Sequence, residues 1–125
     1  MNTIIYIDPK LNIFSDESIK VIIEFRVKPA KAAIAISTTG LTLEQAVQLV
    51  EKSHADFHRE LLLMLESKQM AYKIIHSYKS SFNGVAMKLS GKAINELLSS
   101  KIIKAIYIDE EVRIPEKVID LGYQI

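Results

Sequence analysis

The chain has 125 residues, 49% hydrophobic and 25% charged, which suits a single domain with a packed core rather than a disordered segment. Its formal net charge is +1 and it has no basic stripe with interleaved aromatic residues, so nucleic acid is not expected as a partner. The lack of cysteine excludes disulfides and thiol catalysis, and apolar runs such as 61–65 are far too short for a membrane span.

The first strand candidates lie near the N-terminus. Residues 4–7 are an apolar run that ends at Asp8-Pro9; an extra edge strand and a loosely attached arm are both open, and we favour the arm. Residues 19–27 are rich in β-branched side chains, which predicts a strand. Residues 30–40 are small and lack a clear period, which is typical of a connecting loop.

A long helical pattern then begins at Thr42. Thr42 and Gln45 have the spacing of a capping box, apolar residues recur at three- and four-residue steps as far as Met64 or Leu65, and no Gly or Pro appears until after Met70. A single helix of that length would measure roughly 40 Å, whereas a domain of this size is about 35 Å across. The helix is therefore expected to overhang the domain or to break, and residues 52–56 are the expected break.

The second half of the chain has three further strands and a second helix. Strands are predicted at 72–78, 85–89 and 102–108, and Ser90 is expected to cap a helix that continues to residue 99. The order βαββαβ predicts an α+β, ferredoxin-like fold, with two helices on one face of a four-stranded antiparallel sheet.

This organisation divides the chain into three parts. We expect an N-terminal arm at 1–17, the domain at 18–111, and an extended, mobile C-terminal tail at 112–125.

Candidate catalytic and metal-binding residues are weak. His54 and His58 have helical i, i+4 spacing, but a third ligand is not evident and the glutamate of an H-E-x-x-H motif is absent, so packing explains them better than metal binding. The serines lack a nucleophile elbow and the glycines lack a phosphate-loop pattern. Acids at 109–111 are more typical of a solvated strand end. The sequence thus predicts no enzyme, no metal and no cofactor.

One strand is apolar on both faces. Ile102, Ile106 and Ile108 are expected on the side away from the helices, where Ile22, Ile75 and Ala86 would join them. Because that face of a two-layer fold is normally polar, we expect either a partner surface or coverage by the arm or the tail.

Specific motifs in the second half resemble the propeptide of subtilisin-like serine proteases, the peptidase inhibitor family nine domain. A strand ends at Tyr78-Lys79 and leads into F-N-G-V-A-M-K-L at 82–89. A short helix with alanine and leucine at 93 and 97 follows, and then A-I-Y-I-D-E-E at 105–111. The resemblance covers about residues 19–111 and agrees with the predicted fold.

The run Phe82-Asn83-Gly84 is the structural signature of this resemblance. Asn-Gly tolerates positive φ and is expected to form the turn or bulge between two strands. Phe82 is expected to anchor this hairpin in the core.

The resemblance implies a folding chaperone and tight inhibitor of a secreted subtilisin-like protease, a monomer when free, whose own signal peptide has been removed. In the family, the helix-free face of the sheet packs on two protease helices, whose N-termini are capped by acids that match Asp109 and Glu111. The family's tail binds in the active-site cleft like a product. The implied protease-binding residues are Asp109, Glu111, Ile106, Ile108, Val112, Arg113, Ile114, Tyr123, Gln124 and Ile125.

Departures from the family pattern leave alternatives open. The first helix and the tail are longer than in the simplest bacterial propeptides, so the processed bond is not placed, and Val85 and Met87 vary the family's usual core residues. A free-standing inhibitor of the same family is one alternative. A ferredoxin-like domain that binds a small regulatory molecule is another.

Overall fold

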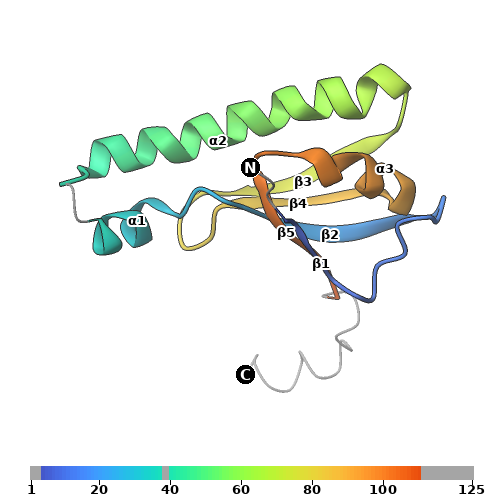
Figure 1. Cartoon of the computed structure of the whole chain (residues 1–125), viewed down its shortest axis with the longest axis horizontal. Coiled ribbons are helices and arrows are strands. Elements are labelled where there is room, and N and C mark those ends of the chain that lie inside the picture. Colours follow the sequence, from blue (N-terminus) through green and yellow to red (C-terminus); the bar gives the residue numbers. More distant parts are fainter. Residues whose placement is uncertain (1–3, 38–39, 111–125) are drawn as a thin grey trace, which may run out of the picture.

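The computed structural model describes residues 4–37 and 40–110. Two helices, α2 and α3, lie on one face of a five-stranded mixed sheet (Figure 1). The strand order is β1-β5-β2-β4-β3, in which β1 and β5 are parallel and the other pairs are antiparallel. The elements are β1 (Tyr6–Ile7), β2 (Ser18–Phe25), α1 (Ala30–Ile36), α2 (Leu43–Met64), β3 (Tyr72–Tyr78), β4 (Gly84–Ser90), α3 (Gly91–Glu96) and β5 (Ile103–Ile108), with 3₁₀ turns at Glu66–Lys68 and Leu97–Ser99.

The α+β class is confirmed, but the expected four-stranded antiparallel sheet is wrong. The difference lies in the N-terminal segment, which adds β1 as a parallel edge strand beside β5. The strands predicted from the sequence otherwise form close to their expected bounds, and β2 occupies the centre of the sheet.

The core fills the space between the sheet and the two helices. Alternate residues of the three inner strands point into it, and they meet one stripe of α2 and the buried side of α3. The buried cluster consists of Val21, Ile23, Phe25, Phe57, Leu61, Leu65, Val85, Met87, Leu89, Ala93, Ile94, Leu97, Ile103 and Ile106.

The predicted capping box at the start of α2 is confirmed. The Thr42 hydroxyl accepts the backbone N–H of Gln45 at 3.1 Å, and the Gln45 side chain accepts the backbone N–H of Thr42 at 3.0 Å. The expected break at residues 52–56 is wrong, because Ser53 and His54 are buried within an uninterrupted helix. The helix instead overhangs the sheet, as Figure 1 shows.

A second correction concerns residues 30–36, which form helix α1 rather than a loop. This helix has no buried residue, and it lies beneath the overhanging start of α2 (Figure 1). Its small apolar side chains show no amphipathic period, which explains why the sequence pattern did not indicate a helix.

The N-terminal segment is integral to the domain and is not a loose arm. The backbone N–H of Asp8 donates to the Ile106 carbonyl at 2.9 Å, and the Asp8 carboxylate accepts the Ile108 N–H at 3.0 Å. Leu11 and Ile13 pack against the core. A side chain on Gly91 would lie 1.8 Å from the Asn12 carbonyl oxygen, so glycine allows the segment to pass close to α3.

This attachment predicts a large effect of the N-terminal segment on stability. The double variant Leu11→Ala/Ile13→Ala should lower the free energy of unfolding by roughly 2–4 kcal/mol, because both side chains leave the core. Urea denaturation followed by circular dichroism measures this. Phe14→Ala is the matched control, since Phe14 is 74% exposed. Equal stability of the double variant and the control would show that the segment is not part of the folded core.

Candidate protein-binding face

The face of the sheet opposite α2 and α3 is largely apolar at its centre. Ile22 lies directly opposite Ala86 on one side and Tyr107 on the other, so these three side chains share the helix-free face. Tyr6 extends the group, with its ring 5.6 Å from that of Tyr107. Tyr107 is 38% exposed, and no helix among the described residues covers this face (Figure 1).

The expected membership of this face was wrong for β5. Ile106 lies opposite Ile23 and is fully buried in the core, and Ile108 lies opposite Val21 on the same core side. Ile102 also packs against the core, whereas Ala105 and Tyr107 point to the helix-free face. The side chains of Ile106 and Ile108 therefore do not form the open surface that the resemblance assigned to them.

The residues expected on this face from β2 and β4 lie there, and the one expected from β3 lies at a bulge. Ile22 and Ala86 lie on the helix-free face by register. Ile75 is the extra residue of a β-bulge, between the pairs formed by Ile74 and His76, and it is 44% exposed.

The acidic group lies where β5 ends. The Asp109 N–H donates to the Lys20 carbonyl at 2.9 Å, and the Lys20 ammonium lies 4.0 Å from the Asp109 carboxylate, whose side chain is only 10% exposed. Glu110 pairs with Lys10. The other protease-binding residues predicted from the resemblance, namely Glu111, Val112, Arg113, Ile114, Tyr123, Gln124 and Ile125, lie outside the described residues.

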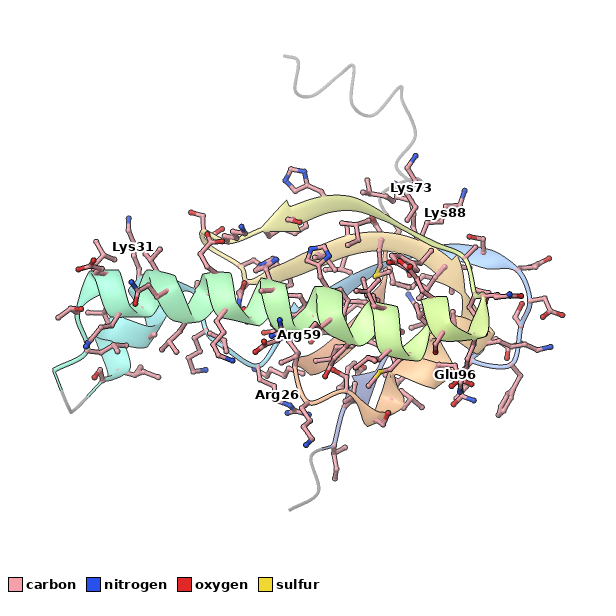
Figure 2. All side chains as sticks on the ribbon, turned by 90° about the horizontal axis from the view of Figure 1, so that it is seen from above. Arg26, Lys31, Arg59, Lys73, Lys88 and Glu96 are labelled. Carbon is pink, nitrogen blue, oxygen red and sulfur yellow. The ribbon has the colours of Figure 1, made fainter. Side chains whose placement is uncertain are left out.

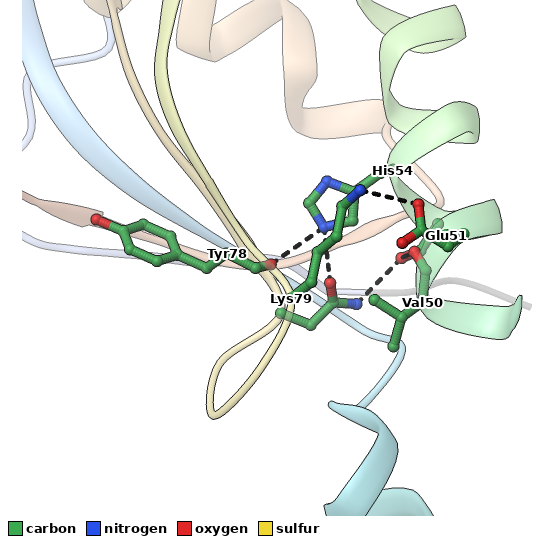
Figure 3. Close-up of polar contacts among 7 residues, drawn as sticks. Val50, Glu51, His54, Tyr78 and Lys79 are labelled. Atoms are coloured by element: carbon green, nitrogen blue, oxygen red, sulfur yellow. Dashed lines mark hydrogen bonds and ion pairs between the residues drawn. The ribbon is translucent and has the colours of Figure 1, made fainter. Parts of the chain in front are cut away.

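A buried polar network supports the hairpin between β3 and β4. The Asn83 amide donates to the Val27 carbonyl at 2.8 Å and to the Ser53 hydroxyl at 3.0 Å, and its oxygen contacts His54 Nε2 at 2.8 Å. Ser53 in turn donates to the Val50 carbonyl at 2.6 Å. Figure 3 shows the part of this network that lies between α2 and the end of β3. Asn83 thus connects helix α2, the segment that follows β2 and the hairpin.

The expectation of positive φ at Asn83-Gly84 was wrong. Among the described residues only Gln69 and Gly40 have positive φ. Gly84 is required for a different reason: a Cβ there would lie 2.0 Å from the Ile23 carbonyl oxygen. Phe82 is half-buried and packs edge-on against Tyr78 at 5.7 Å, and it is not a member of the core cluster.

His54 is held in one neutral form by this network. Its Nε2 faces two acceptors, Asn83 Oδ1 and the Tyr78 carbonyl at 3.2 Å, so Nε2 carries the proton and Nδ1 is buried without a partner. Burial lowers the pKa of His54 below its usual 6.5, against the hydrogen bond that His54 donates to Asn83, which raises it. Lys79 also lowers this pKa, and Glu51, which pairs with Lys79 at 2.8 Å, raises it.

The two histidines of α2 do not form a metal site in the described part of the chain. His58 is exposed while His54 is buried, and no group of three or more His, Asp or Glu side chains is arranged to hold a metal ion in the described ranges. None of the helices there combines the length and hydrophobicity needed to cross a membrane.

A family model described as peptidase inhibitor I9 matches residues 4–115. The chain belongs to the peptidase inhibitor I9 family. Comparisons with curated proteins and with solved structures found no significant match. Members of this family are non-catalytic inhibitory propeptide domains of subtilisin-like proteases, so this chain is not itself an enzyme.

The helix-free face has members that the sequence analysis did not place there. The sequence missed Ala105, Tyr107 and Tyr6 as members of that face. Alternation did not reveal them, because strand β5 is apolar on both sides and β1 was expected to be an arm.

The neutral, buried state of His54 predicts acid sensitivity of the I9 domain. Since its folded-state pKa is lowered, the unfolded chain takes up a proton first as the pH falls below about 6.5. The contribution of His54 to the free energy of unfolding should therefore be complete above that pH, and the free energy of unfolding should decrease from pH 7.5 to pH 5. Urea denaturation at both pH values measures the difference.

Two variants separate His54 from other titrating groups. His54→Gln keeps a donor but cannot be protonated, so its stability should fall less with pH than that of the wild type. His58→Gln changes an exposed residue and should behave like the wild type. The pKa of Asp8 is lowered from 3.8 by backbone hydrogen bonds from Lys10 and Ile108, so protonation of Asp8 changes the stability only below the measured pH range. Identical pH profiles for wild type and His54→Gln would contradict the assignment.

Proposed function

We propose that this I9 domain is the propeptide of a secreted subtilisin-like protease, which it helps to fold and then inhibits. The observation that carries the proposal is the helix-free face, where Ile22 is partly exposed and Tyr107 is 38% exposed beside Ala86, which its neighbours on the sheet bury. An apolar face of this kind is uncommon on a free two-layer domain and suits a surface that a partner covers.

The shape of the face supports contact with helices. The small and aromatic side chains that the sheet presents here would allow two helices of the catalytic domain to lie close against it. A surface that is complete before the protease folds can hold those helices in place, which is the physical basis for the chaperone role.

In this proposal the acids at the end of β5 orient the protease helices on the face, because they would bind the N-terminal ends of those helices. Asp109 and Glu111 would accept N–H groups at the N-termini of the protease helices, where carboxylates complement the helix dipole. Asp109 is largely covered by its own domain and lies beside Lys20, so it would reach the partner by exchanging that contact.

The segment after residue 110 would act as the inhibitory strand. In this proposal Val112, Arg113 and Ile114 begin an extended strand that pairs with the protease's substrate-binding strands, and Tyr123, Gln124 and Ile125 approach the active site as a product would. Main-chain pairing of this type supplies affinity.

The direct test is titration of the purified domain into mature subtilisins while peptide hydrolysis is followed. Stoichiometric, competitive inhibition of at least one enzyme is expected. Rapid digestion of the domain without inhibition across the panel would reject the inhibitor function.

Within that assay, Tyr107→Ala tests the face. The variant should weaken inhibition about tenfold, because an aromatic side chain is lost from the centre of an interface. Leu63→Ala is the matched control: Leu63 is 72% exposed on α2, on the opposite side of the domain, and its removal should leave the inhibition constant unchanged. Equal inhibition by both variants would argue against the helix-free face as the binding surface.

The tail is tested by a chain that ends at Glu111. This truncated chain should keep the wild-type circular dichroism spectrum but inhibit at least about tenfold more weakly and lose competition with substrate, since the strand that pairs in the cleft is gone. Unchanged competitive inhibition would contradict the product-like mechanism while leaving the role of the face intact.

A further inference from the structure

Three lysines form a row across one end of the helix-free face. Lys20 on β2 lies directly opposite Lys88 on β4, and Lys88 lies directly opposite Lys73 on β3. Because neighbouring strands are about 4.8 Å apart, the Cα atoms of the row span only about 10 Å. Figure 2 shows Lys73 and Lys88 extending side by side. We refer to these three residues as the lysine row.

The lysine row works against the stability of the free domain. Like charges directly opposite one another on neighbouring strands repel. Lys20 has Asp109 as a partner at 4.0 Å, but Lys73 and Lys88 make no ion pair within the described part of the chain. Other lysines are paired with carboxylates, among them Lys52, Lys68, Lys79 and Lys92. Folding of the domain alone therefore does not explain the row.

The position of the row connects it to the apolar centre of the face. Lys20 and Lys88 are each two residues along a strand from Ile22 and Ala86, and side chains two apart share a face. A partner that covers the apolar centre would thus also lie over the row. The other end of the face differs, because Glu24 there is already engaged by Lys104 at 3.6 Å.

We infer that the lysine row binds a cluster of Asp and Glu side chains on the partner, and that it selects proteases that carry such a cluster. This inference rests on the proposed function, in which the partner is the catalytic domain of a subtilisin-like protease. Charge complementarity of this kind steers encounter and fixes the register of two surfaces.

A second copy of the domain fits the row poorly. Face-to-face pairing would bring the row of one copy against the row of the other, or against the end where Glu24 is already paired with Lys104. Neither arrangement supplies free carboxylates from the described residues of the face. An acidic partner surface satisfies the row without these conflicts.

The test is the double charge reversal Lys73→Glu/Lys88→Glu in the full chain. The matched control is Lys31→Glu/Lys101→Glu, which changes the net charge equally at two exposed lysines that make no ion pair among the described residues. The inhibition constant is measured against the mature subtilisin that the wild-type chain inhibits most tightly. Reversal in the row should weaken inhibition about tenfold at ~20 mM salt, and the control should stay within about twofold of wild type.

Ionic strength and direct cross-linking give two independent readouts. At ~1 M salt the screening length falls to about 3 Å, so the effect of row reversal should shrink to less than about threefold. A zero-length carbodiimide reagent, which joins ammonium groups to carboxylates in contact, should link Lys73 and Lys88 to Asp or Glu of the protease, and not Lys31 or Lys101.

The stability of the free domain gives a further check. The melting temperature of Lys88→Gln should be equal to or slightly higher than that of the wild type, because repulsion in the row is relieved.

The outcomes separate this inference from the proposed function. No inhibition by the wild-type chain would reject the inhibitor function and the inference with it. Tight inhibition by the wild type and by the row variant alike would overturn only the inference. An equal loss of inhibition in the control variant would also overturn it, and so would protease cross-links that arise from Lys31 and Lys101. Salt-sensitive loss confined to the row variant, with cross-links from the row, supports it.

Discussion

The close approach of β4 to β2 at Gly84 is the constraint on which the rest of the domain depends. Any side chain at this position would collide with the Ile23 carbonyl, and the neighbouring Asn83 carbonyl accepts the Phe25 N–H at 2.9 Å. This approach places the Asn83 amide beneath α2, where it meets His54 and the end of β2. A short motif at a hairpin thereby fixes the position of a long helix across the sheet.

That arrangement leaves the domain covered on one side only. The buried contacts of α2 and α3 all lie on the side of Ile23 and Met87, so the next residues along each strand, Ile22 and Ala86, face outward. Ala86 is buried by its neighbours, whereas Ile22 stays partly exposed, and a partner on this face would cover it. The I9 family supplies such a partner in the protease catalytic domain, which would form a third layer.

Features set by local chemistry were predictable from the sequence, and features set by pairing were not. The Thr42 capping box and the Ser90 cap depend on a few neighbouring residues, and both form as predicted. The faces of β5 were reversed because both sides of the strand are apolar and the ladder shifts register beside Glu24. Strand β1 is two residues long and depends on its partner β5. At Asn83 the Asn-Gly pattern indicated a tight turn, whereas burial beneath α2 gives it a different role.

The position of the lysine row on the helix-free face links binding at that face to the proposed role of the segment that follows β5. Strand β5 ends at Ile108, opposite Val21, so the chain leaves the sheet next to Lys20 and the lysine row. A partner held at this end of the face would therefore hold the start of the following segment close to its own surface. Tethering of this kind raises the effective concentration of the second binding element without any new contact. Binding at the row and occupation of the active site would then be coupled, because the first contact would reduce the entropy lost in making the second.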